Sequence, residues 1–536
     1  MAPWWTTAVL YQIYLRSFQD SNGDGVGDLE GARTRLDALV ELGVDAVWLS
    51  PVHPSPNADF GYDVADYDAV APEFGGMAAL ERFVEAAHER GLKVLLDGVF
   101  NHTSDQHAWF QSARQGPSSP HHDFYHWHTG DRPPNNWAST FGGPAWTFDP
   151  VCQRWYLHSF APQQPDLNWS NPAVEEAVLA SMKGWLDRGI DGFRLDVFNC
   201  YAKHPSLAAN PWRTDLLGRV ARPLYPFLAQ EHVHDRDRPE LAGILARMRQ
   251  LADQCAHEVV LIGETLDERF RYDNAAGWCG PDRLHQAFHF RWLHSKWSAK
   301  AFHAALKAQQ EAFEGPPVWV LGNHDFKRLA SRWGAWSQAD TDARMRLVPL
   351  LMLGLPGSAV LYQGDELGIP EQRLPRRLIV DPPGKRFWPL YPGRDGCRTP
   401  MAWDATLHGG FSTAAPWLPL HADHLTRNVA AQRSDPSSIW SAWRDMLALR
   451  RRLRVLRDGR LRLSPAPDGP VLGFSRVSED DTAVVVVNMS RKPVAWHSPA
   501  GEALSAVHLG IGSVELQGKQ VVLGPLSGAV LAAPGG

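Results

Sequence analysis

Short apolar runs that alternate with amphipathic segments constrain the fold of this chain more than any other feature. Runs this short are typical of strands buried on both faces of a parallel sheet. The clearest amphipathic segment is 77–90, where Leu80, Phe83 and Ala87 share one face and Gly91 is placed to end a helix. Eight strands alternating with helices predict an α/β fold, a (β/α)8 TIM barrel. The predicted strands are residues 8–14, 44–50, 92–99, 192–197, 259–263, 286–290, 318–321 and 359–362.

Two regions interrupt this alternation. Residues 103–171, rich in His, Trp, Pro, Ser and Gly, show no helical period and predict an irregular insertion after the third strand. From residue 456 the pattern alternates, as in 482–489, and predicts a C-terminal antiparallel β-sandwich. We therefore expect a barrel from 1–102 and 172–455, an insertion at 103–171 and a β-domain at 456–536. The β-domain has no obvious aromatic platform for starch, so we expect a packing domain.

Charge and composition exclude several classes of partner. The chain has 53 basic and 59 acidic residues, a net charge of −6, and no basic block, so neither nucleic acid nor a membrane surface is an expected partner. No stretch approaches the roughly 18 to 20 apolar residues of a membrane span, and the N-terminus lacks the pattern of a signal peptide. Five scattered cysteines without a C-x-x-C pair argue against a disulfide framework and favour the cytoplasm. The sequence leaves the oligomeric state open.

Polar residues gather where the predicted strands end, which is where barrel enzymes build their sites. A single carboxylate there is as readily a helix cap or an ion-pair partner. Three carboxylates, one arginine and two histidines on one rim instead predict an active site. These residues are His102 after the third strand, Arg194 and Asp196 at the end of the fourth, Glu264 after the fifth, and His324 and Asp325 after the seventh.

In this order, the segments resemble the α-amylase family of glycoside hydrolases (family 13), in particular its oligo-1,6-glucosidase and α-glucosidase branch. Segments 20–28, 164–168 and 398–401 support that branch, and the resemblance runs from about residue 9 into the C-terminal domain. It implies that Asp196 is the nucleophile and Glu264 the general acid/base. Asp325 would be the third catalytic carboxylate, which grips sugar hydroxyls and distorts the ring.

The implied roles agree with physical expectation. Arg194 and Asp196 are two residues apart on one strand, so they face the same way and Arg194 should lower the pKa of Asp196. A retaining mechanism needs two carboxyl groups in different protonation states, about 5 to 5.5 Å apart, and forms a covalent glucosyl-enzyme. His102 and His324 would donate hydrogen bonds to the same sugar. No His-x-x-x-His pair on a helix accompanies these two histidines, so a zinc site is not expected, and no cofactor is expected for catalysis.

The resemblance also implies a closed glucose pocket. Asp59 and Arg398 would form the ion pair at its far end, Tyr62 would stack on the sugar ring, and Phe141 and Phe160 would form its walls. A bidentate arginine–carboxylate pair that also binds hydroxyls makes such a pocket blind. The enzyme would therefore accept one terminal glucose and act from the chain end. Phe141 and Phe160 could equally belong to a local core.

Segment 20–28 carries oxygen groups at every second position. They are Asp20, Asn22, Asp24, the carbonyl of Val26, and Asp28. This spacing matches the start of an EF-hand-like loop without its Glu at position 12. The resemblance implies a structural Ca²⁺ or Mg²⁺ there, and the alternative is an Asp/Asn/Gly turn without metal.

The function we expect is a retaining exo-acting α-glucosidase that releases α-glucose from the non-reducing ends of small α-glucosides, with transfer to sugar or alcohol acceptors. Val197 in this branch tends to accompany α-1,6 activity, whereas segment 198–239 is more like maltose-type enzymes, so we favour α-1,4. The alternatives are an oligo-1,6-glucosidase (isomaltase), or a glucosyl-transferring relative such as a trehalose synthase or sucrose isomerase. A non-catalytic binding protein on the same barrel would usually have lost the catalytic carboxylates.

Overall fold

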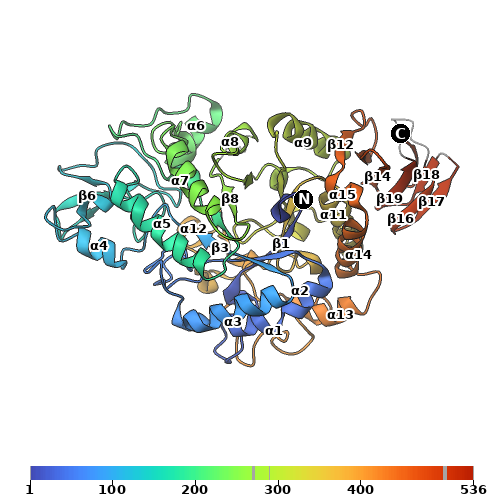
Figure 1. Ribbon diagram of the computed structural model, residues 1–536, viewed down its shortest axis with the longest axis horizontal. Helices are drawn as coiled ribbons and strands as arrows, with labels where there is room; N and C mark the ends of the chain where they lie inside the picture. The colour runs from blue at the N-terminus through green and yellow to red at the C-terminus, as the bar shows by residue number, and fades with distance from the viewer. Residues whose placement is uncertain (1, 268–271, 289, 499–503, 519, 535–536) are drawn as a thin grey trace.

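The computed structural model describes the chain except residues 1, 268–271, 289, 499–503, 519 and 535–536. Its centre is an eight-stranded parallel sheet in the order β10-β11-β1-β2-β3-β7-β8-β9 (Figure 1). The strands are β1 (Val9–Ile13), β2 (Ala46–Leu49), β3 (Lys93–Gly98), β7 (Gly192–Leu195), β8 (Val260–Glu264), β9 (Gln286–Phe288), β10 (Val318–Val320) and β11 (Ser358–Tyr362).

The sheet curls into a nearly closed barrel. In its register, β1 lies between β11 and β2, with Leu10 opposite both Val360 and Ala46. The first and last strands in this order, β10 and β9, come together near Gln286. The Gln286 side chain donates a hydrogen bond to Pro316 O (3.2 Å) and accepts one from Ser358 Oγ (2.9 Å). The predicted TIM barrel is confirmed, with a strand in each predicted run, although position 289 of the sixth run lies outside the described residues.

Helices cover the outside of this barrel. The predicted helix at 77–90 is α3, whose buried face includes Leu80 and Phe83, and Gly91 follows it with φ of 76°. The helices are α1 (Leu29–Thr34), α2 (Leu36–Leu42), α3 (Gly76–Glu89), α4 (Ala108–Ala113), α5 (Pro172–Asp187), α6 (Leu216–Ala221), α7 (Leu241–Asp253), α8 (Tyr272–Ala276), α9 (Ala299–Ala312), α10 (Leu329–Arg332), α11 (Gln338–Leu353), α12 (Pro382–Phe387), α13 (Val429–Arg433), α14 (Ile439–Arg452) and α15 (Arg454–Asp458).

The segment between β3 and α5 is more regular than its sequence indicates. It contains α4 and a three-stranded antiparallel sheet of β4 (Trp127–His128), β6 (Arg154–Leu157) and β5 (Trp146–Asp149). A small core of Trp137, Trp146 and Leu157 holds this sheet. The strands have two to four residues each, too few to show a period of two in the sequence.

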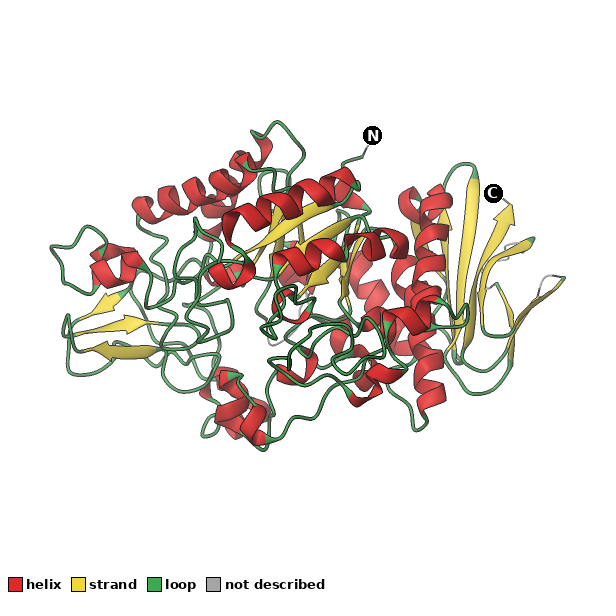
Figure 2. Cartoon of the chain, turned by 90° about the horizontal axis from the view of Figure 1, so that it is seen from below, coloured by secondary structure: helices red, strands yellow, loops and turns green. Residues whose placement is uncertain are grey.

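Two antiparallel sheets form the C-terminal end of the molecule. One has the order β12-β13-β14-β19-β16 and the other β15-β18-β17. They lie at the opposite end of the long axis from the small sheet of β4, β5 and β6 (Figures 1 and 2). The strands are β12 (Arg460–Leu463), β13 (Val471–Val477), β14 (Asp481–Asn488), β15 (Val494–His497), β16 (Ala506–Ile511), β17 (Val514–Gln517), β18 (Gln520–Leu523) and β19 (Ser527–Pro534).

Two buried arginines join the C-terminal sheets to the barrel. Arg476 of β13 donates to Gly354 O (3.0 Å) after α11 and to Gly459 O (2.6 Å). Arg450 of α14 donates to Gly357 O (2.6 Å) before β11 and to Leu456 O (3.0 Å) in α15, which leads into the C-terminal sheets. No ion pair between either guanidinium and a carboxylate is found in the described part of the chain, so backbone carbonyls solvate both charges.

All five cysteines are free thiols. Within the described ranges, no helix combines the length and apolar character needed to cross a membrane.

Candidate active site

A cavity of about 610 Å³ opens at the carboxyl ends of the barrel strands. Its size is within the range of small-molecule sites. Asp196 directly follows β7, Glu264 ends β8, and Asp325 lies in the turn after β10. The structure brings this predicted trio together in one pocket. The other predicted residues that line it are Asp59, Tyr62, His102, Phe141 and Phe160.

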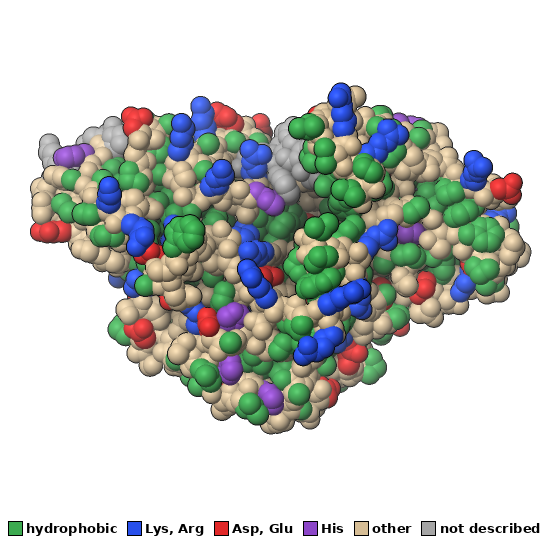
Figure 3. Space-filling model, turned by 180° about the vertical axis from the view of Figure 1, so that it is seen from behind, with side chains coloured by type: hydrophobic (Ala, Val, Ile, Leu, Met, Phe, Trp, Pro, Cys, Tyr) green, Lys and Arg blue, Asp and Glu red, His purple; other side chains and the backbone are tan. Residues whose placement is uncertain are grey.

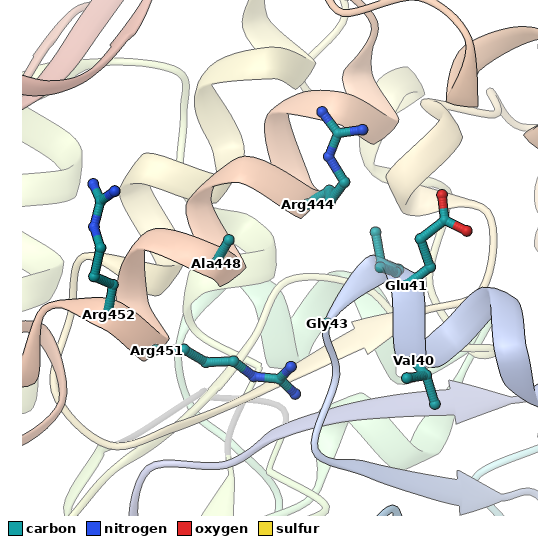
Figure 4. Close-up of a pocket in the computed structure, with 8 residues that line it drawn as sticks. Val40, Glu41, Gly43, Arg444, Ala448, Arg451 and Arg452 are labelled. Carbon is teal, nitrogen blue, oxygen red and sulfur yellow. The ribbon is translucent and has the colours of Figure 1, made fainter. Parts of the chain in front are cut away.

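A second hollow lies on the other side of the barrel. It is lined by residues of α2 and α14, among them Glu41, Arg444 and Arg451, and Gly43 places it next to the start of β2 (Figure 4). Barrel enzymes use the carboxyl ends of their strands for catalysis and the amino ends for stability. The cavity that holds the three carboxylates is therefore the candidate active site.

Arg194 lies beneath the carboxylates, with 1% of its surface exposed. Its Nη1 contacts Asp97 Oδ1 at 2.6 Å and Asp196 Oδ1 at 2.7 Å, and its Nη2 forms an ion pair with Glu264. Tyr62 donates its hydroxyl to the other oxygen of Asp97 at 2.9 Å. One fixed guanidinium thus anchors the predicted nucleophile and the predicted acid/base.

The electrostatics of Asp196 differ from the prediction. Burial raises its pKa, and Arg194 and His102 offset this only in part, so the net direction is upward. The predicted lowering is wrong because the charge of Arg194 is shared with Asp97 and Glu264 and because Asp325 adds a like charge. Burial likewise raises the pKa of Asp97, to about 7, against the attraction of Arg194.

Asp325 has the opposite shift. Burial raises its pKa, but the charged guanidinium groups of Arg394 and Arg398 lower it well below the usual range, so Asp325 is ionised. Arg398 Nη2 lies 3.0 Å and Arg394 Nη1 3.2 Å from Asp325 Oδ1. Burial also lowers the pKa of His324 far below its ordinary value, so this ring is neutral. Two of the three carboxyl groups thus have pKa values shifted in opposite directions, that of Asp196 upward and that of Asp325 downward.

Asp59 pairs with Arg394, not with Arg398 as the sequence predicted. Arg394 Nη2 is 2.5 Å from Asp59 Oδ1 and 2.7 Å from Asp381 Oδ1. Arg398 is fully buried behind Asp325, where its Nε donates to the carbonyl of His324 at 2.9 Å. The two arginines flank the single 3-10 turn Asp395–Cys397, so only the path of this loop decides which of them reaches Asp59.

The two predicted histidines occupy different places. His102 lines the pocket, and its Nε2 lies 2.8 Å from Tyr62 O and 3.1 Å from Gln164 Nε2. His324 lies behind the pocket, stacked on Tyr62 with ring centroids 5.2 Å apart, and its Nδ1 is 2.8 Å from Gln12 Nε2. His324 therefore orients Tyr62 and Asp325 from below, and its direct contact with sugar stays a prediction.

Phe141 and Phe160 pack edge to face with their ring centroids 5.6 Å apart. Both line the cavity, and Arg394 lies over the Phe141 ring at 5.1 Å. Val197, directly after Asp196, packs against Phe160 in the same cluster and has a left-handed backbone with φ of 36°. A β-branched residue in this region is strained by roughly 1 to 3 kcal/mol, a cost that tends to concentrate at active sites.

The predicted metal-binding segment forms a tight loop after β1. Asp20 Oδ1 accepts from the amides of Asn22 and Gly23, and Asp24 Oδ1 accepts from Val26 N at 2.8 Å. Asp28 caps α1 by accepting from Gly31 N at 2.6 Å. The oxygens are of the kind that Ca²⁺ and Mg²⁺ prefer. Among the described residues, no group of three or more His, Cys, Asp or Glu is arranged so that it could hold a metal ion.

Sequence reasoning missed three residues of the site. They are Arg394, four positions before the predicted Arg398, Asp97, at the end of the strand that His102 follows, and Gln164, which the sequence indicates only as part of a family segment. Gln164 donates to Asp59 Oδ2 (3.4 Å) and Tyr62 O (3.1 Å), and thereby ties the insertion to the loop after β2. The position of Asp97 at a strand end was a signal that could have identified it.

Comparison with known proteins gives consistent matches. The family model described as alpha amylase, catalytic domain, matches residues 12–459. A probable alpha-glucosidase of Rhizobium meliloti (strain 1021) is 41% identical over 504 residues, covering 92% of this chain and 91% of that protein. An oligo-1,6-glucosidase of Parageobacillus thermoglucosidasius is 34% identical over 536 residues, covering 92% of each chain.

Solved structures match the fold of this chain over 99 to 100% of its length. The alpha-glucosyl transfer enzyme XgtA superposes with a TM-score of 0.92 at 40% identity, over 100% of both chains. The trehalulose synthase MutB from Pseudomonas mesoacidophila MX-45 gives a TM-score of 0.89 at 30% identity, over 99% of this chain and 100% of that one. With a family match over most of its length and relatives of this similarity, the chain belongs to the α-amylase family of glycoside hydrolases.

Proposed function

We propose that this enzyme is a retaining exo-acting α-glucosidase that releases α-glucose from the non-reducing ends of small α-glucosides. The observation that carries the proposal is the cavity where Asp196, Glu264 and Asp325 meet above Arg194. The names of several relatives, alpha-glucosidase and oligo-1,6-glucosidase, support it.

In the first step, Glu264 donates a proton to the glycosidic oxygen while a carboxylate oxygen of Asp196 bonds to the anomeric carbon and the leaving alcohol departs. In the second step, water gives a proton to Glu264 and attacks the same carbon, and the bond to Asp196 breaks. Two inversions release glucose in its original α form. Asp325, ionised beside Arg394, is the acceptor for sugar hydroxyls.

The exo mode follows from Asp59 and Arg394. Their ion pair lies in the pocket lining and is tied to Asp381, which is itself buried. A charged pair held in this way offers hydrogen bonds to the hydroxyls of one terminal glucose. In the proposed mode this pair closes the pocket on that side, so the substrate enters by its non-reducing end.

For linkage, we propose α-1,4 (maltose-type) cleavage, with α-1,6 cleavage as the alternative. Segment 198–239, which is more like maltose-type enzymes, supports α-1,4. Val197, which lines the pocket next to the nucleophile, and a relative named oligo-1,6-glucosidase support the alternative. A sucrose isomerase or trehalose synthase activity is the second candidate, because a trehalulose synthase shares the fold along the whole chain.

Three further properties belong to this proposal. Transfer of glucose to alcohols and sugars would use the same intermediate, and one structural relative is titled a glucosyl transfer enzyme. A structural Ca²⁺ or Mg²⁺ would bind the loop that contains Asp20, Asn22 and Asp24. A cytoplasmic location would fit five free thiols.

Proton NMR of the enzyme turning over maltose, and then isomaltose, tests the function. We expect early α-glucose, with maltose consumed faster. Faster isomaltose cleavage would assign the enzyme to the oligo-1,6-glucosidases, and conversion of either sugar or of sucrose into another disaccharide with little free glucose would favour the isomerase. Asp196→Asn should reduce turnover by at least about 10⁴-fold because the nucleophile is lost, with unchanged circular dichroism. Activity at the wild-type level in this variant would contradict the assignment of Asp196 as the nucleophile.

A further inference from the structure

A further cavity, of about 660 Å³, lies at the amino ends of the barrel strands, on the opposite side of the barrel from the catalytic carboxylates. It is lined by Val9, Asp45 and Lys93, which lie at or next to the first residues of β1, β2 and β3. Residues of the N-terminal segment 2–7 and of α15 also line it, and the N-terminus lies next to α15 in Figure 1. The cavity adjoins the hollow of Figure 4, with which it shares Arg451. Its volume is that of a site for a small molecule.

Arginines give this cavity an excess of positive charge, although the whole chain carries −6. Among the described residues, four arginines and two carboxylates line it, which leaves an excess of two positive charges. Lys93 also lines it, but its charge is balanced by Asp191 outside the cavity, at 2.8 Å. On the face shown in Figure 3, by contrast, Lys and Arg side chains are spread among acidic and hydrophobic ones. The charged lining residues other than Lys93 are Arg450, Arg451, Arg454, Arg457, Asp45 and Asp458.

The two arginines of α14 in this lining are only partly satisfied by the protein. Arg450 is 3% exposed and donates to carbonyls through both Nη atoms, but its Nε is buried without a hydrogen-bond partner. Arg451 contacts Asp45 Oδ1 at 3.0 Å through Nη2, and its side chain is half exposed. Each guanidinium therefore has donors that the described protein does not use.

The two arginines of α15 have still fewer partners. Arg454 contacts Asp458 Oδ2 at 2.8 Å through Nε, which leaves both Nη atoms. Arg457 forms no ion pair with a described carboxylate, and its Nε is buried without a hydrogen-bond partner. Charged donors of this kind are strongly stabilised by an anion.

A phosphate monoester matches this arrangement in charge and in shape. It carries about −1.5 to −2 charges at neutral pH, close to the excess of two in the lining. The flat fork of a guanidinium bonds to two phosphate oxygens at once. Trp4 also lines the cavity, with its ring 6.0 Å from Lys93 Nζ, and offers an apolar surface to the molecule that carries the phosphate.

We propose that this cavity is a second binding site, for a small molecule that carries a phosphate monoester. Arg451, Arg454 and Arg457 bind the phosphate oxygens, the buried charge of Arg450 adds to their attraction, and Trp4 packs against the rest of the ligand. The ligand and the substrate occupy opposite sides of the barrel, so both bind at the same time. The inference does not depend on the proposed α-glucosidase function.

Isothermal titration calorimetry of the full-length protein tests this site. Glucose 6-phosphate, AMP and inorganic phosphate are titrated at equal ionic strength and about pH 7.5, where the phosphate is largely doubly charged. We expect saturable binding of at least one monoester with a Kd below about 1 mM, and weaker binding of inorganic phosphate because it has no body to cover Trp4. Preference for glucose 6-phosphate would identify the ligand as a sugar phosphate, and preference for AMP as a nucleotide.

Two variants locate the site. The Arg454 side chain is 85% exposed, so Arg454→Met leaves the fold intact, and loss of its charge-assisted contact should raise the Kd about 10-fold. Arg457→Met should do the same. Arg460→Met is the matched control, because it removes the same charge at an exposed position that does not line the cavity, and it should leave the Kd unchanged at physiological ionic strength.

Three results would overturn the inference. The first is the absence of saturable binding of either monoester, and the second is inorganic phosphate that binds as tightly as both. The third is a Kd that Arg454→Met and Arg457→Met leave unchanged, or that Arg460→Met raises as much as they do, since the ligand would then bind elsewhere or respond only to net charge.

Discussion

Asp59 combines two features that usually exclude one another. Burial raises its pKa to about 6, although Arg394 and Arg398 act against this shift, and yet its side chain lies within 2.5 Å of Arg394. The carboxyl group therefore titrates close to the pH at which many enzymes work. Its charge, and with it the ion pair that would bind the terminal glucose, depends on pH.

This predicts a pH-dependent effect of Asp59→Asn. Above about pH 6 the wild-type carboxylate is charged and accepts strong hydrogen bonds, so the variant should lose about 10- to 100-fold in kcat/KM for maltose. As pH falls through about 6, the wild-type side chain takes a proton and comes to resemble the amide. The ratio of the two kcat/KM values should therefore shrink toward low pH. A constant ratio between about pH 5 and pH 8 would contradict this role of Asp59.

At the scale of elements, the loop after β1 is the place where binding of a cation can be tested most directly. Its oxygen groups alternate along the chain, but they also accept hydrogen bonds from the loop itself. If a cation binds the folded loop and not the unfolded chain, its removal destabilises the protein.

We expect EDTA to lower the unfolding temperature by roughly 2 to 3 °C, corresponding to a ligand present at about 100 times its Kd. Excess Ca²⁺ should restore it, and Asp24→Ala should make the protein insensitive to both. If the unfolding temperature is the same with EDTA and with Ca²⁺, the oxygen groups of this loop form a turn that binds no metal. Differential scanning calorimetry measures all three conditions.

The barrel strands could be predicted because each is buried on both faces and therefore reads as an unbroken apolar run. The catalytic trio could be predicted because each carboxylate follows such a strand directly. The small sheet of β4, β5 and β6 escaped because strands of two to four residues show no period. The partner of Asp59 could not be predicted because an irregular loop positions Arg394, and nothing local in the sequence fixes the path of such a loop.

At the scale of the whole molecule, Arg476 joins two parts of the chain. It is fully buried, and its donors reach carbonyls at Gly354, Leu456 and Gly459. The carbonyl of Leu456 also accepts from Arg450 (3.0 Å), so replacing Arg476 with an apolar residue removes the arginine donor of Gly354 and Gly459 in particular, at a cost of about 1 to 3 kcal/mol for each unsatisfied group.

We therefore expect Arg476→Met to destabilise the protein by about 2 kcal/mol or more, measured as a lower unfolding temperature and a shorter half-life at elevated temperature. Arg460→Met, at an exposed position on the neighbouring strand β12, is the matched control and should change neither. If both variants unfold alike, Arg476 does not hold the barrel and the C-terminal sheets together.

The register of β1 has a consequence for synthesis. One edge of β1 pairs with β2 nearby, but its other edge pairs with β11, with Val9 opposite Ala359. A ribosome adding about 5 to 20 residues per second needs on the order of tens of seconds to make the chain between these partners. Throughout that time the first strand displays unpaired amides and carbonyls, the kind of edge along which chains associate wrongly. Slower elongation would lengthen this exposure, so the yield of folded enzyme should be sensitive to translation speed and to chaperones that cover nascent strands.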